Sequence, residues 1–152
     1  MDIYYKPISE SGKQMINYVC KYAPVELFKG FGQECAVLEE MPENFDKSDK
    51  IAHANLCGFG KSVIQAVLEG KVEELVLVNC CDSMRRVYDI IENTKKCKFL
   101  YMLDLPHEDN ECENIKFAQS ILRLKNAYER YSHRTFDRDC LLYTSPSPRD
   151  YA

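Results

Sequence analysis

Cysteine and glycine residues concentrate in the segment HANLCGFGKS, which spans His53 to Ser62. Cys57 in this segment, and the pair Cys80 and Cys81 further along, come just before stretches with helical periodicity. A helix N-terminus presents unpaired N–H groups and a positive dipole end, which favour a thiolate. Thiolates placed there suit a metal ion or an iron–sulfur cluster. The alternative is that these cysteines are small buried residues at packed helix starts.

The letters GFGKS also resemble the end of a phosphate-binding loop. That motif requires a glycine five positions before its second glycine, Gly60, and Asn55 stands there instead. The preceding letters KIAHAN are a poor candidate for the buried strand that such a loop follows. The segment is therefore interpreted as a ligand loop, in which Cys57 binds metal and Gly58 and Gly60 let the backbone approach a bulky group.

The spacing of the cysteines and the composition of the chain argue against several kinds of site and partner. Eight cysteines occur, at positions 20, 35, 57, 80, 81, 97, 112 and 140, and none are spaced as CxxC, which argues against a zinc finger. The chain has 152 residues, 45% of them hydrophobic, and a net charge of −4 without a basic stripe, which argues against nucleic acid as a partner. No apolar run reaches about 18 residues and no leader is apparent, so no membrane contact and a cytoplasmic, reducing location are expected.

The last residues have a different character. CLLYTSPSPRD, Cys140 to Asp150, resembles the translation of a sequencing adapter, so residues 1–139 are expected to be an incomplete N-terminal α/β domain and 140–152 a non-native tail. The alternative is a genuine Ser/Pro-rich tail. The tail is expected to make few core contacts.

Strands and helices are predicted to alternate before that tail. Strands are expected at 15–20, 34–38, 74–79 and 98–103. One helix is expected to begin at Pro24, a second near Gly58, and a third after a cap at Asp82 or Ser83. A fourth, long amphipathic helix is expected to include Phe117 to Tyr131. This alternation predicts an open parallel α/β sheet of the Rossmann or flavodoxin type. Ligands gather beyond the carboxyl ends of such strands, where Cys20, Cys80, Cys81 and the segment Asp104–His107 are expected.

Three segments together resemble the 2-hydroxyacyl-CoA dehydratase family: YAPVELFKGFG, NLCGFGKSVIQAVLEG and LVLVNCCDSMRRVYD. The resemblance covers Met15 to Tyr131. It implies an oxygen-sensitive 4Fe–4S cluster held by three cysteines, of which Cys57 matches the first and Cys81 the second, with the third beyond this chain. Cys80 departs from the family pattern, in which a single cysteine precedes the aspartate. An additional cysteine resembles the related double-cubane cluster reductases, which need more thiolates. Cys20 could join such a set, whereas Cys35, Cys97 and Cys112 are expected to be structural.

The same resemblance implies the reaction and its partners. A separate ATP-dependent activator protein would deliver one electron, and a second homologous subunit would complete the enzyme. A 2-hydroxyacyl-CoA would then lose water to give an enoyl-CoA. The alternatives are an ATP-dependent reductase of the double-cubane type and a non-catalytic metal- or cluster-binding electron-transfer component. Arg85 and Arg86 could meet a CoA phosphate or remain solvated, and His53 and His107 could be acid–base groups or ordinary loop residues.

One geometric expectation follows from the cluster assignment. The helix after Cys57 leads into the strand that ends at Cys81, and a parallel crossover returns the chain to the same edge of the sheet. Cys57 and Cys81 should therefore face one concave pocket, away from Cys97 and Cys112.

Overall fold

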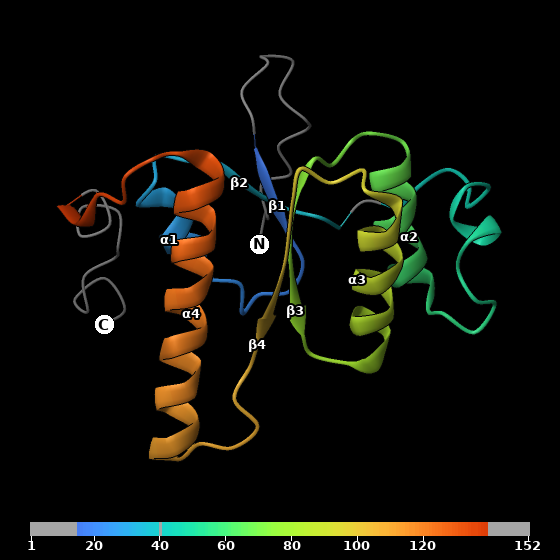
Figure 1. The fold of residues 1–152 in the computed structure, drawn as a ribbon. Helices are drawn as coiled ribbons and strands as arrows, with labels where there is room; N and C mark the ends of the chain where they lie inside the picture. The colour runs from blue at the N-terminus through green and yellow to red at the C-terminus, as the bar shows by residue number, and fades with distance from the viewer. Residues whose placement is uncertain (1–14, 40, 140–152) are drawn as a thin grey trace, which may run out of the picture.

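The computed structural model describes residues 15–39 and 41–139, and the predicted tail from Cys140 lies outside them. Strands and helices alternate along the chain as expected (Figure 1). The strands are β1 (Ile16–Tyr18), β2 (Cys35–Val37), β3 (Glu74–Asn79) and β4 (Phe99–Asp104). The helices are α1 (Val25–Lys29), α2 (Gly58–Leu68), α3 (Asp82–Thr94) and α4 (Glu111–Ser132), with a 3-10 turn, η1, at Ser48–Lys50.

The four strands form one open sheet in the order β2-β1-β3-β4. Every neighbouring pair is parallel, and β3 pairs with β4 over its whole length, from Glu74 opposite Phe99 to Asn79 opposite Asp104. This is the strand order of flavodoxin-like sheets. The predicted open parallel α/β fold is confirmed.

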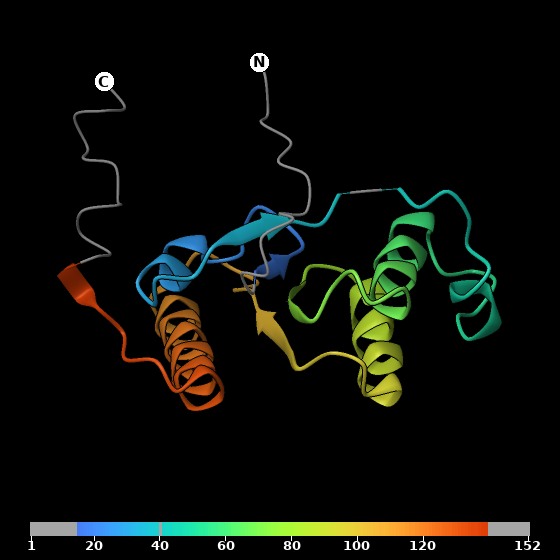
Figure 2. The ribbon, with the colours of Figure 1, turned by 90° about the horizontal axis from the view of Figure 1, so that it is seen from above.

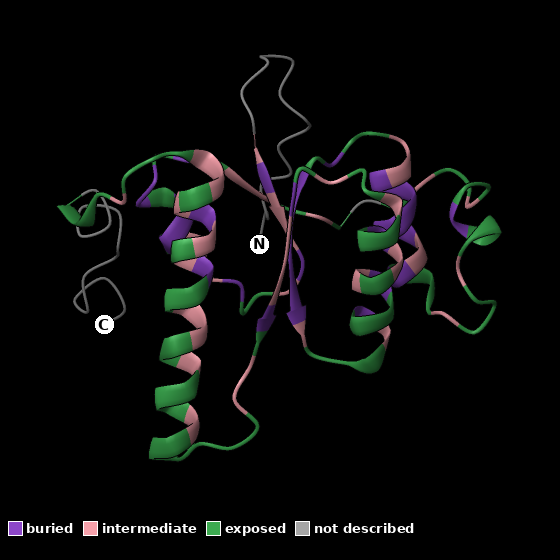
Figure 3. Cartoon of the chain, viewed as in Figure 1, coloured by how far each residue is buried: buried purple, intermediate pink, exposed green. Residues whose placement is uncertain are grey.

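Helices cover both faces of the sheet, with α2 and α3 on one side and α1 and α4 on the other (Figures 1 and 2). Strand β3 is central, and its residues Leu75 to Val78 are fully buried (Figure 3). A strand covered on both faces needs an unbroken apolar run rather than an alternating one, which explains the letters LVLV. Within the described ranges, no helix has the length and hydropathy needed to cross a bilayer.

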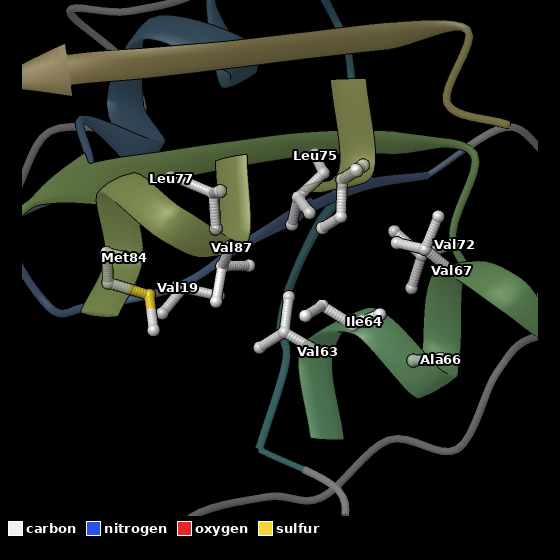
Figure 4. Packing of buried hydrophobic residues seen from close by; sticks show 11 residues of the cluster. Val19, Val63, Ile64, Ala66, Val67, Val72, Leu75, Leu77, Met84 and Val87 are labelled. Atoms are coloured by element: carbon white, nitrogen blue, oxygen red, sulfur yellow. The ribbon is translucent and has the colours of Figure 1, made fainter. Parts of the chain in front are cut away.

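Each face of the sheet has its own hydrophobic cluster. Under α2 and α3 the cluster is aliphatic and includes Val63, Leu77 and Val87 (Figure 4). Under α1 and α4 it is largely aromatic, and Tyr128 lies at its centre with edge-to-face contacts to Phe28 and Phe99 at 5.2 and 5.1 Å between ring centroids. These two clusters fix the helices whose N-termini lie beside the cysteines.

The expected helix cap at Asp82 or Ser83 is wrong by one residue. Cys81 is the N-cap of α3, with extended backbone angles, and Asp82 is the first helical residue. The Asp82 side chain is 97% exposed, and its carboxylate lies 3.8 Å from Arg85 one turn later. A carboxylate in the first turn still complements the helix dipole, so Asp82 favours the helix start without capping it.

Candidate functional site

Cys57 is held at the start of α2 by the local backbone. It is the N-cap residue, with φ −61° and ψ 152°, and the Gly60 N–H donates to its sulfur at 3.3 Å. An N-cap side chain normally accepts such a bond through oxygen, so sulfur here replaces the more common serine or aspartate. The Cys57 residue is exposed, which leaves its thiol accessible to a ligand.

The glycine at position 60 serves helix packing rather than clearance for a ligand. A Cβ there would lie 3.0 Å from Val87 Cγ2 and 3.3 Å from Leu56 Cγ, whereas a Cβ on Gly58 would meet nothing within 4 Å. Gly60 therefore allows α3 to approach α2 closely. The expectation that Gly60 makes room for a bulky group is corrected, because Val87 occupies that space.

Cys80 and Cys81 form the turn between β3 and α3. The Cys80 N–H donates to the carbonyl of Val78 at 2.8 Å, and both cysteines are exposed. Although Cys80 is exposed as a residue, partial burial of its thiol raises the pKa of that thiol, and the neighbouring thiols of Cys81 and Cys20 raise it further.

Cys20 follows β1 in an unusual conformation. Its φ is +83°, in the left-handed region that residues other than glycine rarely adopt. Its carbonyl accepts from the Ala23 N–H at 3.1 Å, which closes the turn before α1. Because β1 and β3 are parallel neighbours, the turns that follow them lie at the same edge of the sheet.

These four cysteines line one cavity of about 490 Å³, here called the thiol pocket. The expected convergence of Cys57 and Cys81 on one pocket is found, with Cys80 and Cys20 beside them. The pocket opens at the carboxyl edge of the sheet, between the N-termini of α2 and α3.

The remaining described cysteines do not line the thiol pocket. Burial raises the pKa of Cys35 to about 12 and that of Cys97 to about 11, and both pack against the hydrophobic clusters. Their placement fits a structural role. Cys112 is exposed in the first turn of α4, so it is not a core residue.

The donor chemistry of the thiol pocket fits an iron–sulfur cluster, since such clusters are held by cysteine thiolates and accept backbone hydrogen bonds at sulfur. The thiols of Cys57 and Cys81 are accessible, and each stands at the positive end of a helix of at least eleven residues. Across residues 15–39 and 41–139, no three cysteine, histidine or acidic side chains are arranged to hold a metal ion.

The polar residues singled out in the sequence have local partners. Lys61 makes an ion pair with Asp49 at 2.8 Å. His53 accepts from the Asn55 N–H through Nδ1 at 3.1 Å, and the His107 backbone N–H donates to Glu113. These contacts fit ordinary loop residues.

A polar bridge ties the thiol turn to the neighbouring strand. Arg85 Nε donates to Asn79 Oδ1 at 2.7 Å, and Asn79 Nδ2 donates to Asp104 Oδ1 at 2.9 Å. Asn79 directly precedes Cys80, so the bridge anchors the start of the turn to both α3 and β4. Arg85 is therefore engaged with the protein and not simply solvated.

The apolar part of the pocket lining was not predicted from the sequence. Side chains of Val37 and Leu38 from the end of β2 and of Phe59 from α2 line it together with the thiols. The predicted strand at 34–38 was the available signal, because its carboxyl end had to lie beside that of β1 in a parallel sheet.

Most of the chain matches the model of a known family. Residues 20–143, more than half of the chain, match the family model described as 2-hydroxyglutaryl-CoA dehydratase, D-component. No curated protein matches the chain.

Proposed function

The chain belongs to the 2-hydroxyglutaryl-CoA dehydratase D-component family, and from that premise we propose that it is the iron–sulfur component of a 2-hydroxyacyl-CoA dehydratase-type enzyme. The family is that of one component of a multi-component dehydratase, so partner components belong to its function. The single observation that carries the proposal is the convergence of Cys57 and Cys81, from two helix starts, on one pocket.

We propose Cys57 and Cys81 as two cluster ligands, with a third outside the described residues and Cys80 as an additional candidate. When bound, the cluster would supply one-electron transfer and a Lewis-acidic iron. The N-termini of α2 and α3 place partial positive charge beside both sulfurs, which would complement the negative charge of a thiolate-ligated cluster. The Gly60 N–H already donates to the Cys57 sulfur, and such a bond orients a ligand and tunes its basicity.

We also propose the partners of this component and the reaction that it supports. An ATP-dependent activator protein would supply the electron, a second homologous subunit would complete the site, and a 2-hydroxyacyl-CoA would be dehydrated to an enoyl-CoA. Apolar side chains from β2 and α2 would exclude water from the thiol pocket and so strengthen electrostatic interactions inside it. A cytoplasmic location agrees with this oxygen-sensitive chemistry and remains a prediction.

A second candidate is favoured by one observation. Four cysteines line the thiol pocket, Cys20 and Cys80 as well as the two proposed ligands. A larger cluster of the double-cubane type needs more thiolates than a single cubane does. An ATP-dependent reductase is therefore the alternative enzyme, and a passive cluster-binding electron carrier is the alternative outside enzymes.

The decisive experiment is anaerobic reconstitution of the full chain with iron and sulfide. We expect broad visible charge-transfer absorption and bound iron, and loss of most of that iron in Cys57→Ser and in Cys81→Ser. Serine keeps an acceptor at the N-cap of α2, so the Cys57→Ser variant tests the thiol rather than the helix. Cys97→Ser is the matched control, because Cys97 packs against the core at the other end of β4.

Retention of iron by both serine variants at the level of Cys97→Ser would refute the ligand assignment. Turnover then separates the candidate functions. Conversion of a 2-hydroxyacyl-CoA to an enoyl-CoA, with activator and ATP, identifies a dehydratase. Reduction without loss of water identifies the alternative enzyme, and a loaded but inactive assembly identifies a carrier.

A further inference from the structure

The thiol pocket lies at the point where the chain reverses its direction across the sheet. From β1 the chain moves outward to β2, and then crosses back to β3 on the other side of β1. In open parallel sheets the connections on either side of such a point diverge and leave a crevice at the carboxyl edge. The volume of about 490 Å³ falls within the range, about 300–1,000 Å³, of pockets that hold small molecules.

The lining of this pocket is mostly apolar. Beside the four cysteines, its uncharged lining consists of Tyr18, Val19, Val37, Leu38, Phe59 and Met84. Figure 4 shows Val19 and Met84 at the edge of the aliphatic cluster, so the pocket is continuous with the core under α2 and α3. The surface that a ligand would meet next to the thiols is therefore hydrocarbon.

Among the described residues, two charged side chains line the pocket, and their charges cancel. Lys21 is basic and Glu39 is acidic. The Lys21 ammonium lies 5.2 Å from the ring centroid of Tyr22, an aromatic side chain that is 56% exposed. A carboxylate brought into the pocket would lose its hydration. The positive charge of Lys21 would favour it, but the negative charge of Glu39 would offset that attraction. Cysteines that hold a cluster would be thiolates, and their negative charge would repel it further.

We infer that the thiol pocket selects thioesters with an apolar acyl chain over dicarboxylic acyl groups. The inference rests on the proposed function in placing an acyl-CoA at this site. It differs from the glutaryl group that appears in the family's description, because the described residues supply no net positive charge for a second carboxylate. Apolar groups gain from burial against this lining, while an ionised carboxylate loses more than it regains.

Binding of three probes to the full chain tests the inference by isothermal titration calorimetry. Isovaleryl-CoA and glutaryl-CoA have the same number of acyl carbons and differ in the terminal carboxylate, and free CoA measures the contribution of the nucleotide portion. None carries the 2-hydroxyl group, so no turnover occurs. We expect isovaleryl-CoA to bind at least about tenfold more tightly than glutaryl-CoA and than CoA. Equal affinity of the two thioesters, or no gain over CoA, would overturn the inference.

A charge introduced at the pocket gives a sharper test. Val37 is 38% exposed at the end of the edge strand β2, so Val37→Lys adds a cation to the lining without burying it. Ile51→Lys is the matched control, since Ile51 is 46% exposed and does not line the pocket. We expect Val37→Lys to reduce the preference for isovaleryl-CoA by about tenfold or more, and Ile51→Lys to leave it unchanged. The same response in both variants would show that the acyl group lies elsewhere.

The same samples distinguish failure of this inference from failure of the proposed function. Acyl selectivity without bound iron after reconstitution would leave the acyl site standing and refute the iron–sulfur assignment. Bound iron without acyl selectivity would refute the acyl site and leave the iron–sulfur assignment standing.

Discussion

At the scale of single residues, Cys20 has the most unusual backbone near the thiol pocket. Its φ of +83° brings Cβ close to the backbone, which costs about 1–2 kcal/mol for any residue other than glycine. Strain of this kind persists where the surrounding structure demands it, often at functional sites. At Cys20 the demand comes from the tight turn that joins β1 to α1.

Two substitutions separate the thiol of Cys20 from its backbone. Cys20→Gly removes both the sulfur and the strain, and Cys20→Ala removes only the sulfur. We expect Cys20→Gly to exceed Cys20→Ala in free energy of unfolding by about 1 kcal/mol, measured in urea. Equal stabilities would mean that the left-handed conformation is not maintained in solution.

The pH dependence of stability should report the buried thiol of Cys97. Burial disfavours the thiolate and raises its pKa from the ordinary value of 9.0 to about 11. Between these values the unfolded chain loses the proton while the folded chain keeps it, so stability is complete below pH 9 and is lost as the pH rises towards 11. The expected loss is roughly 1–3 kcal/mol. Denaturation of Cys97→Ala across this range should show a smaller loss, whereas the exposed control Cys112→Ala should follow the parent.

At the scale of elements, the contact between α2 and α3 depends on Gly60. A methyl group there would lie 3.0 Å from Val87 Cγ2 and 3.4 Å from the Cys57 sulfur. We expect Gly60→Ala to lower the free energy of unfolding by about 1–2 kcal/mol, because overpacking outweighs the gain in helix propensity. Gly58→Ala is the control, with open space at its Cβ, and should lose no stability. An unchanged Gly60→Ala variant would show that the two helices separate easily.

At the scale of the whole molecule, the two ends of the sheet have different tasks. Residues at or after the carboxyl ends of β1, β2 and β3 line the thiol pocket, and the amino end of β3 holds α4. Glu74 is 2% exposed there and accepts from Tyr131 Oη at 2.9 Å and from Tyr128 Oη at 3.3 Å. A buried carboxylate needs such donors, so these bonds fix the long helix to the sheet.

Loss of one donor should affect stability and leave the site intact. Tyr131→Phe removes the shorter bond to Glu74, and we expect a loss of about 1 kcal/mol in the free energy of unfolding. Iron bound after reconstitution should not change, because five residue steps along β3, about 17 Å, separate Glu74 from Asn79 and the thiol turn beyond it. A variant of normal stability that binds less iron would contradict this division of the sheet.

The sequence by itself determined the local features of this protein. Hydrophobic periodicity and glycine positions predicted the strands and most helix starts closely, because burial of one face imposes a repeat on neighbouring residues. The exception is α4, which begins at Glu111, six residues before the predicted Phe117. The residues Glu74–Asn79 were predicted as a strand, and β3 has these bounds. The positions of Cys57 and Cys81 before helices followed from the same local pattern, and the strand alternation predicted that parallel crossovers would return them to one edge.

Only the tertiary structure decided which distant side chains share a surface. Val37 and Phe59 are more than twenty positions apart, and the tertiary structure brings them together in the lining of the pocket of Cys57 and Cys81. The packing of Gly60 against Val87 and the burial of Glu74 beneath two tyrosines likewise depend on contacts between separate elements. Hydrophobic periodicity predicts which face of each segment is buried. The chemistry of the pocket depends on which segments lie side by side, and this is decided by tertiary packing.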